Sequence, residues 1–213
     1  MNKSNILAHR GVWTRRSEAN SLKALRAAIE SGFGIETDVR DCNGKLVIAH
    51  DPPREDDSFS VDGLFSLINS SEYSGRIALN IKSDGLQSLL RETLQCVHTD
   101  QFFYFDMSIP DTLHYERAGL RFYCRLSEYE VESDLFANAS GVWVDSFSGD
   151  FDQIEASLRM LESGKRVAFV SPELHGRHHE ETWSRLKDAE LAVYDAFELC
   201  TDFPVAAFEY FGE

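Results

Sequence analysis

Short apolar runs alternate with amphipathic segments along the whole chain. Residues 5–8 form a short apolar run that is typical of a buried strand, and residues 22–31 then carry apolar side chains at helical spacing. Gly32 follows this segment and ends the predicted helix. Strand and helix signals continue to alternate to the end of the chain, without an internal repeat or a linker. This order favours a parallel sheet whose strands are connected by crossover helices.

The same patterns place the individual elements. The predicted strands cover residues 5–8, 35–40, 46–49, 76–83, 102–105, 121–126, 142–144, 167–170 and 191–194. The predicted helices cover residues 22–31, 61–69, 85–97, 110–118, 151–163, 178–188 and 204–211, and residues 127–139 carry only a weak helical pattern. The strand at residues 46–49 follows Asn43-Gly44, a strong hairpin signal, so we interpret it as a β-hairpin decoration on the second strand. The other strands give eight β/α units and predict a closed (β/α)₈ TIM barrel, forming a single domain over residues 1–213.

Polar side chains follow the ends of the predicted strands. In (β/α)₈ barrels the functional site lies at the carboxyl ends of the strands, where the β/α loops begin. Such residues also start ordinary loops, but here basic and acidic side chains follow three consecutive early strands. The candidates at strand ends are His9, Arg10, Glu36, Asp38, Asn80, Lys82, Asp106, Asp145, Glu173 and His175.

Glu36 and Asp38 lie on one face of the second predicted strand, because residues 35–40 alternate between apolar and polar side chains. Two carboxylates this close repel each other unless a proton or a cation lies between them. Oxygen ligands of this kind suit Mg²⁺ or Ca²⁺. The alternative is a solvated face of an antiparallel pair, which is the usual role of such a pattern. The hairpin then brings His50 towards the two carboxylates.

The residue types around this pair fit the cleavage of a phosphodiester. Histidine as a residue type titrates near neutral pH, so the pair His9 and His50 can supply a base and an acid in one turnover. Arg10 and Lys82 are cations that suit phosphate oxygens, and His175 is a further candidate for contact with the substrate. A divalent ion would polarise a phosphoryl oxygen, and the cations would stabilise the added negative charge.

Composition restricts the possible partners. Apolar residues make up 43% and charged residues 27% of the 213 residues, which is ordinary for a globular protein, and the net charge is −15. This charge disfavours nucleic acid and anionic membranes, so a phosphate-bearing substrate needs a local positive centre.

The four cysteines match no zinc or C-x-x-C spacing and are expected to be free thiols. No leader or membrane-spanning run is recognisable, so we expect a cytoplasmic protein.

Several of these segments together resemble the glycerophosphodiester phosphodiesterase family, within the wider group of phosphatidylinositol-phospholipase-C-like barrels. The resemblance extends from the first strand to the last helix, and each matching segment is short. It implies a TIM barrel with one divalent cation held by Glu36 and Asp38, and His9 with His50 as the acid–base pair. The matching segments are His9-Arg10-Gly11, Asn20-Ser21, residues 34–40, Asn43-Gly44, His50-Asp51, Ile81-Lys82 and residues 201–204.

The chain departs from the family pattern in three places. The glutamate that the family usually carries on the third barrel strand as a metal ligand is replaced by Asn80, which offers a carbonyl oxygen without a charge. Only 29 residues separate His50 from Asn80, so the family's capping insertion is largely missing and a more open site is expected. The loop before Asn20 reads Glu-Ala-Asn instead of Pro-Glu-Asn, so only Asn20 of this motif is carried over.

Three functions remain open from the sequence. The first is metal-dependent hydrolysis of a small soluble diester of the glycerophosphodiester, sugar-phosphate or polyol-phosphate type. The second is a lyase or transferase reaction, as in sphingomyelinase-D-like barrels, in which a hydroxyl of the substrate attacks and a cyclic phosphate forms. The third is a non-catalytic barrel that binds phosphorylated ligands. The sequence does not decide the alcohol, the ion or the oligomeric state.

Overall fold

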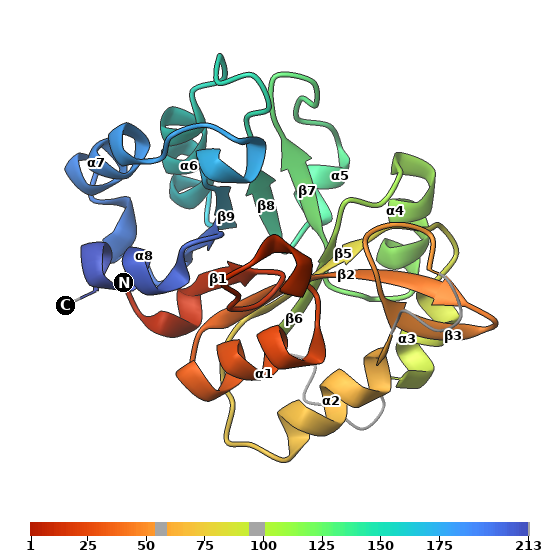
Figure 1. The fold of residues 1–213 in the computed structure, drawn as a ribbon. Coiled ribbons are helices and arrows are strands. Elements are labelled where there is room, and N and C mark those ends of the chain that lie inside the picture. The colour runs from red at the N-terminus through yellow and green to blue at the C-terminus, as the bar shows by residue number, and fades with distance from the viewer. Residues whose placement is uncertain (54–58, 94–100, 213) are drawn as a thin grey trace.

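A computed structural model describes residues 1–53, 59–93 and 101–212. Within these residues, eight parallel strands follow one another around a ring in the order β7-β8-β9-β10-β1-β2-β5-β6, with helices packed outside them (Figure 1). The (β/α)₈ barrel predicted from the sequence is therefore confirmed. The strands are β1 (Ile6–His9), β2 (Gly34–Cys42), β5 (Ile77–Ile81), β6 (Phe102–Phe105), β7 (Tyr123–Leu126), β8 (Gly141–Val144), β9 (Arg166–Val170) and β10 (Phe197–Thr201).

The extent of backbone pairing between neighbouring strands differs around the ring. Most neighbouring strands share a ladder, such as the five registered pairs from Ile35–Ile77 to Val39–Ile81 between β2 and β5. Strands β6 and β7 are instead joined by an isolated parallel bridge between Tyr104 and Phe122, where the Tyr104 N–H donates to the Arg121 carbonyl at 2.9 Å. We call this junction between β6 and β7 the seam of the barrel.

The helices begin and end close to the predicted residues. Ser21 caps α1 by accepting a hydrogen bond from the Ala24 N–H at 3.1 Å, and Gly32 ends the helix with a left-handed φ of 77°. The predicted helix at residues 85–97 is found as α3 in its first part, and residues 94–97 lie outside the described residues. The helices are α1 (Leu22–Ser31), α2 (Val61–Asn69), α3 (Gln87–Thr93), α4 (Ile109–Arg117), α5 (Leu135–Asn138), α6 (Gln153–Glu162), α7 (Glu180–Asp188) and α8 (Pro204–Phe211).

The interior of the barrel is filled by large side chains. Phe103 stacks on Tyr123 and Phe105 stacks on Trp143, each with ring centroids 3.8 Å apart. A second, larger cluster lies between the sheet and the helices. Because the barrel is packed and not hollow, ligands can enter only at its ends. The interior cluster consists of Leu7, Ala78, Phe103, Phe105, Tyr123, Trp143, Ala168, Val170 and Cys200.

The predicted hairpin is present beside β2. Strand β3 (Lys45–Ile48) pairs with β2 in antiparallel register, and the two-residue strand β4 (Phe59–Ser60) adds to its outer edge. Asn43 and Gly44 both have positive φ, 51° and 75°, as a tight hairpin turn requires. The hairpin extends beyond the barrel wall (Figure 1), and residues 49–51 lead its chain back towards the barrel end.

The predicted last strand is wrong. Residues 191–194 were expected to form it, but Leu191–Val193 is a short 3₁₀ helix with Val193 70% exposed, and the strand is β10. A charged residue inside β10 conceals its strand pattern: Glu198, the second residue of the strand, is fully buried and pairs with two arginines. Its Oε1 lies 2.9 Å from Arg76 Nε and 2.7 Å from Arg166 Nη2.

No helix in the described ranges is both long and apolar enough to span a bilayer.

Candidate functional site

A cavity of about 300 Å³ opens at the carboxyl ends of the barrel strands. Most of the residues predicted from strand ends line it, contributed by β1, β2, β5, β6, β8 and the loops that follow β3 and β9. Arg16, Arg125 and Phe147 complete the wall. The predicted residues that line the cavity are His9, Arg10, Glu36, His50, Asn80, Lys82, Asp106, Asp145 and His175.

His9 ends β1 and is held on its inner side by Asp202, the first residue after β10. The two side chains join Nδ1 to Oδ1 at 2.6 Å, and the indole N–H of Trp13 donates to the His9 carbonyl at 2.9 Å. A carboxylate accepts hydrogen bonds, so the contact places the imidazole proton on Nδ1. His9 Nε2 then lies free of that partner, 3.8 Å from Glu36 Oε2, where it can accept a proton.

Glu36, Asp38 and Asn80 bring three oxygens together on adjacent strands. Asp38 is in register with Asn80 across the β2–β5 ladder, and Glu36 is two residues away on the same face. All three side chains are buried, and Glu36 Oε2, Asp38 Oδ1 and Asn80 Oδ1 have no hydrogen-bond partner. Burial, and then the Asp38 charge, raise the pKa of Glu36 above its ordinary value of 4.5. The arrangement therefore favours a proton or a cation.

These oxygens fit a divalent ion, although with one charge fewer than three carboxylates would supply. Within the described ranges no group of three or more His, Cys, Asp and Glu side chains is placed to hold a metal. The third donor here is the amide oxygen of Asn80, which belongs to the ligand types of Mg²⁺ and Ca²⁺. Buried oxygens without partners are costly, and an ion would satisfy them.

The other Asp38 oxygen is held by Arg10 and Asn20. Arg10 Nε lies 2.8 Å from Asp38 Oδ2, and Asn20 Nδ2 donates to the same oxygen at 2.7 Å. Arg10 and Asn20 adopt left-handed φ of 59° and 62°, and the Asn20 N–H donates to the Arg10 carbonyl at 2.9 Å. A Cβ at Gly11 would lie 2.6 Å from the Ala24 carbonyl oxygen, so only glycine allows α1 to pack here. These contacts fix the His-Arg-Gly segment.

Alternating charges continue around the rim from β2 to β8. Lys82 Nζ lies 3.6 Å from Asp38 Oδ1 and 3.0 Å from Asp106 Oδ2. Arg125 on β7 forms an ion pair with Asp106 and lies 3.5 Å from Asp145 Oδ2. The sequence did not single out Arg125, because it lies inside a predicted apolar strand; its alternation with Tyr123 on the inner face was the available signal.

The two remaining histidines line opposite sides of the cavity. His50 follows β3, its side chain is 48% exposed, and its Nδ1 lies 2.9 Å from Asp51 Oδ1. His175 is less exposed, and its Nε2 lies 2.7 Å from Asp145 Oδ1. The imidazole of His50 is therefore the freer of the two to meet a substrate.

Glu173 does not line the cavity. It was expected on an extension of the seventh barrel strand with His175, but Pro172–His175 is a short 3₁₀ helix. The Glu173 carboxylate accepts hydrogen bonds from the Ser171 and Thr201 hydroxyls and, at 3.1 Å, from the Asp202 N–H. Its role is to hold the segment that carries Asp202. Proline at the first position of this turn explains why the strand stops before it.

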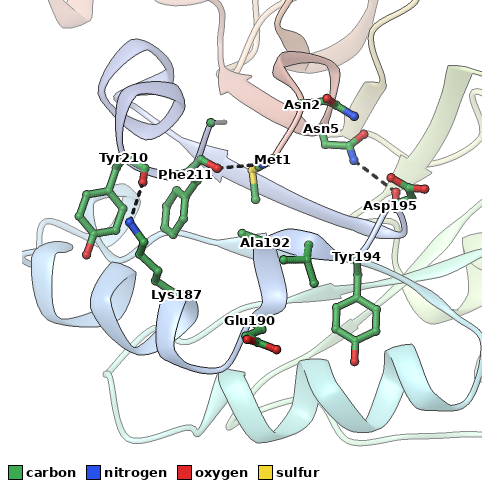
Figure 2. A pocket seen from close by; sticks show the side chains of 12 residues that line it. Met1, Asn2, Asn5, Lys187, Glu190, Ala192, Tyr194, Asp195, Tyr210 and Phe211 are labelled. Atoms are coloured by element: carbon green, nitrogen blue, oxygen red, sulfur yellow. Dashed lines mark hydrogen bonds between the residues drawn. The ribbon is translucent and has the colours of Figure 1, made fainter.

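A second cavity, of about 460 Å³, is lined by residues that precede β1 and β10, at the amino ends of the strands; Figure 2 shows its lining side chains. Residues from both ends of the described chain line it. The Met1 amino group donates to the Phe211 carbonyl at 2.8 Å, Asn5 Nδ2 donates to the Asp195 carbonyl at 3.2 Å, and Lys187 Nζ donates to the Tyr210 carbonyl at 3.4 Å. None of the candidate residues lines it.

No family profile and no curated protein matches this sequence. Solved structures, in contrast, share its fold. A protein from Galdieria sulphuraria described as a candidate glycerophosphodiester phosphodiesterase shares 19% identity over 98% of both chains, with a TM-score of 0.77. A glycerophosphodiester phosphodiesterase from Parabacteroides distasonis shares 14% over 99% of this chain and 98% of its own, with a TM-score of 0.71. A phosphodiesterase from Oleispira antarctica, solved with the product sn-glycerol-3-phosphate, shares 14% over 98% and 97%, with a TM-score of 0.68. The likeness inferred from short motifs is thus confirmed in the fold.

Proposed function

We propose that this protein is a metal-dependent phosphodiesterase that hydrolyses a small diester of the glycerophosphodiester, sugar-phosphate or polyol-phosphate type. One observation carries the proposal. Asp202 orients His9 so that its other ring nitrogen lies 3.8 Å from Glu36, at a cavity that also presents Arg10, Lys82 and His50. Glu36, Asp38 and Asn80 each have a buried oxygen without a hydrogen-bond partner. The fold shared with the phosphodiesterases named above supports it.

Glu36, Asp38 and Asn80 are the residues that would hold the ion, Mg²⁺ or Ca²⁺. When bound, a divalent ion polarises a phosphoryl oxygen and neutralises part of the charge that develops on it. Arg10 fixes the orientation of Asp38 through its Nε. Lys82, 3.6 Å from Asp38, adds a positive charge on the β5 side of the cavity. Both cations also compensate the negative charge of the diester, which the net charge of −15 would otherwise repel.

The histidines divide the proton transfers. His9 Nε2 takes a proton from the attacking water, whose oxygen forms the new bond to phosphorus, and Asp202 stabilises the imidazolium that results. His50 gives a proton to the alcohol oxygen as its bond to phosphorus breaks. The products are an alcohol and a phosphomonoester. His175 binds the substrate on the opposite wall, where Asp145 holds its ring.

We infer the working compartment from the cysteines. Cys42, Cys124 and Cys200 are free, and Cys96 lies outside the described residues. Free thiols are typical of a reducing compartment, so we place the protein in the cytoplasm.

The test is phosphorus NMR of the purified protein with Mg²⁺ and then with Ca²⁺, against a mixture of diesters in water enriched in oxygen-18. The expected result is a monoester signal that carries the heavy-isotope shift, and its loss in His9→Ala with an unchanged melting temperature. A cyclic phosphate signal would move the protein to the lyase or transferase class. If no diester is consumed with either ion, and neither ion changes the melting temperature, the hydrolase proposal is wrong and a non-catalytic barrel remains.

A further inference from the structure

A third cavity, of about 300 Å³, lies next to the candidate site at the seam between β6 and β7. We call it the seam cavity. Its walls come from the residues that follow β6, the first turn of α4, the loop after β7 and the short helix α5. Apolar side chains form much of its surface, among them Met107, Ile109, Cys124, Val131, Leu135 and Phe136.

The seam cavity exists because the barrel is incompletely paired here. Strands β6 and β7 share an isolated bridge at Tyr104 and Phe122, whereas β7 and β8 form a ladder of four residue pairs. Beyond the bridge, the ion pair between Asp106 and Arg125 links the two strands. The backbone therefore leaves a gap towards the carboxyl ends, and the side chains of α4 and α5 border it.

The seam cavity adjoins the candidate site. Asp106 and Arg125 line both cavities, so the two share a wall at the seam. Aromatic rings extend from one to the other: the Phe147 ring lies 4.9 Å from that of His175 and 5.8 Å from that of Tyr129, between centroids. The Arg125 guanidinium lies 5.2 Å from the Phe147 ring. A molecule whose phosphate occupies the candidate site can thus reach the seam cavity along this wall.

The mouth of the seam cavity exposes apolar surface to water. Ile109, the first residue of α4, is 68% exposed, and Tyr129 and Val131 in the loop after β7 are 74% and 78% exposed; all three line the cavity. A chain with net charge −15 gains nothing in solubility from such a cluster, and exposed apolar surface beside a polar site is typical of ligand binding. The chemistry of the walls favours an apolar ligand.

We propose that the seam cavity binds a linear alkyl group carried by the alcohol part of the phosphodiester substrate. The inference rests on the proposed function for the binding of the substrate's phosphate. It goes beyond that function by naming the group that the substrate's alcohol part carries. The diester places its phosphate among His9, Lys82 and Arg125, and its alkyl group passes over Asp106 into the space between α4 and α5. Preference for the substrate then increases with alkyl length, by about fourfold per buried methylene, until the cavity is filled.

Two measurements keep the alkyl site and the hydrolase activity separate. The first is calorimetric binding of methyl, butyl and octyl phosphate, which require no turnover. The second is kcat/KM for glycerol phosphodiesters with methyl, butyl and octyl substituents. The variants are Ile109→Glu and Met107→Asp, which put a charge at the mouth and in the wall. Val205→Glu on α8 is the matched control, because Val205 is 51% exposed and lines neither cavity.

Wild-type protein and Val205→Glu are expected to bind octyl phosphate at least tenfold more tightly than methyl phosphate. Both seam variants should bind octyl phosphate no more tightly than methyl phosphate. Their affinity for methyl phosphate should equal that of the wild type. Equal affinity for all three monoesters, or a gain that survives in both seam variants, overturns the alkyl site. Hydrolysis without chain-length preference overturns it as well but leaves the hydrolase proposal standing. Chain-length-dependent binding without hydrolysis of any diester supports the alkyl site and overturns the hydrolase.

Discussion

His9 Nδ1 and Asp202 Oδ1 lie 2.6 Å apart, although the two residues are 193 positions apart in the sequence. The barrel makes the contact possible, because β1 and β10 are neighbours and pair in parallel from Ile6–Leu199 to Ala8–Thr201. The register places the residue that ends β1 beside the residue that follows β10. The two ends of the chain therefore meet at the base that the proposed mechanism requires.

Asp202→Asn is expected to lower kcat by about 10²–10⁴-fold and to change KM little. The amide can donate a hydrogen bond to Nδ1, which would leave the proton on Nε2, where the base must be free. The fold is expected to remain intact because the two side chains are nearly isosteric. Steady-state kinetics with a diester, together with a thermal melt, would check this.

The matched control for that variant is Asp188→Asn, an exposed aspartate at the end of α7. It removes the same charge far from the cavity and should leave kcat unchanged. A kcat for Asp202→Asn equal to that of this control would show that the carboxylate does not orient the base.

Local patterns predicted most of the barrel. The helix at residues 22–31 was recognisable from its cap and its closing glycine, and the Asn43-Gly44 turn from residue types alone. Strand β10 could not be recognised, because the burial of its Glu198 depends on Arg76, which precedes β5, and on Arg166 of β9, and both are far from it in sequence. A local pattern carries no information about a partner 122 residues away.

The sequence predicted the site residues that lie at strand ends. It did not predict which of them contact residues on other strands. Glu36, Asp38 and Asn80 follow from alternation and topology; the structure puts Asp38 in register with Asn80 and leaves one oxygen of each residue without a hydrogen-bond partner. The ion pair of Arg125 with Asp106 and the hydrogen bond from the Asp202 N–H to Glu173 join segments that are distant in sequence, so local patterns do not reveal these partners. The roles assigned to His9, His50, Arg10, Lys82 and His175 stay predictions that kinetics must test.

Asn80→Asp is expected to tighten the binding of a divalent ion by about tenfold or more. The substitution adds a third carboxylate of the same size beside Glu36 and Asp38, which attracts the ion and, without it, increases repulsion. The melting temperature should therefore fall in the presence of a chelator and rise more steeply than wild type with Mg²⁺ or Ca²⁺. Thermal melts across an ion titration measure both effects. Asn2→Asp, at an exposed position, is the control, and an identical ion response in both variants would contradict the metal site.

Glu36→Gln is expected to stabilise the ion-free protein at neutral pH. Because the pKa of Glu36 is raised in the folded state, the stability associated with it is present below its ordinary pKa of 4.5 and is lost as pH rises through the folded-state pKa. Glutamine does not ionise, so the variant should not lose this part of the free energy of unfolding as pH rises. Urea unfolding with a chelator, at several pH values between about 4 and 8, should show a decline in the wild type that is smaller in the variant. Parallel curves would show that burial does not raise this pKa. The variant should also lose its stabilisation by divalent ions.

His50→Ala is expected to slow the cleavage of alkyl diesters by about 10²–10⁴-fold while sparing diesters with a p-nitrophenyl leaving group. An alkoxide needs a proton as it departs, whereas p-nitrophenolate is stable without one. His175→Ala, the matched variant on the opposite wall, should raise KM for both kinds of substrate and leave their ratio of kcat values unchanged. Comparing kcat for the two leaving groups in each variant assigns the acid. If the ratio changes in His175→Ala and not in His50→Ala, the proton comes from the histidine that Asp145 holds, and His50 only lines the entrance.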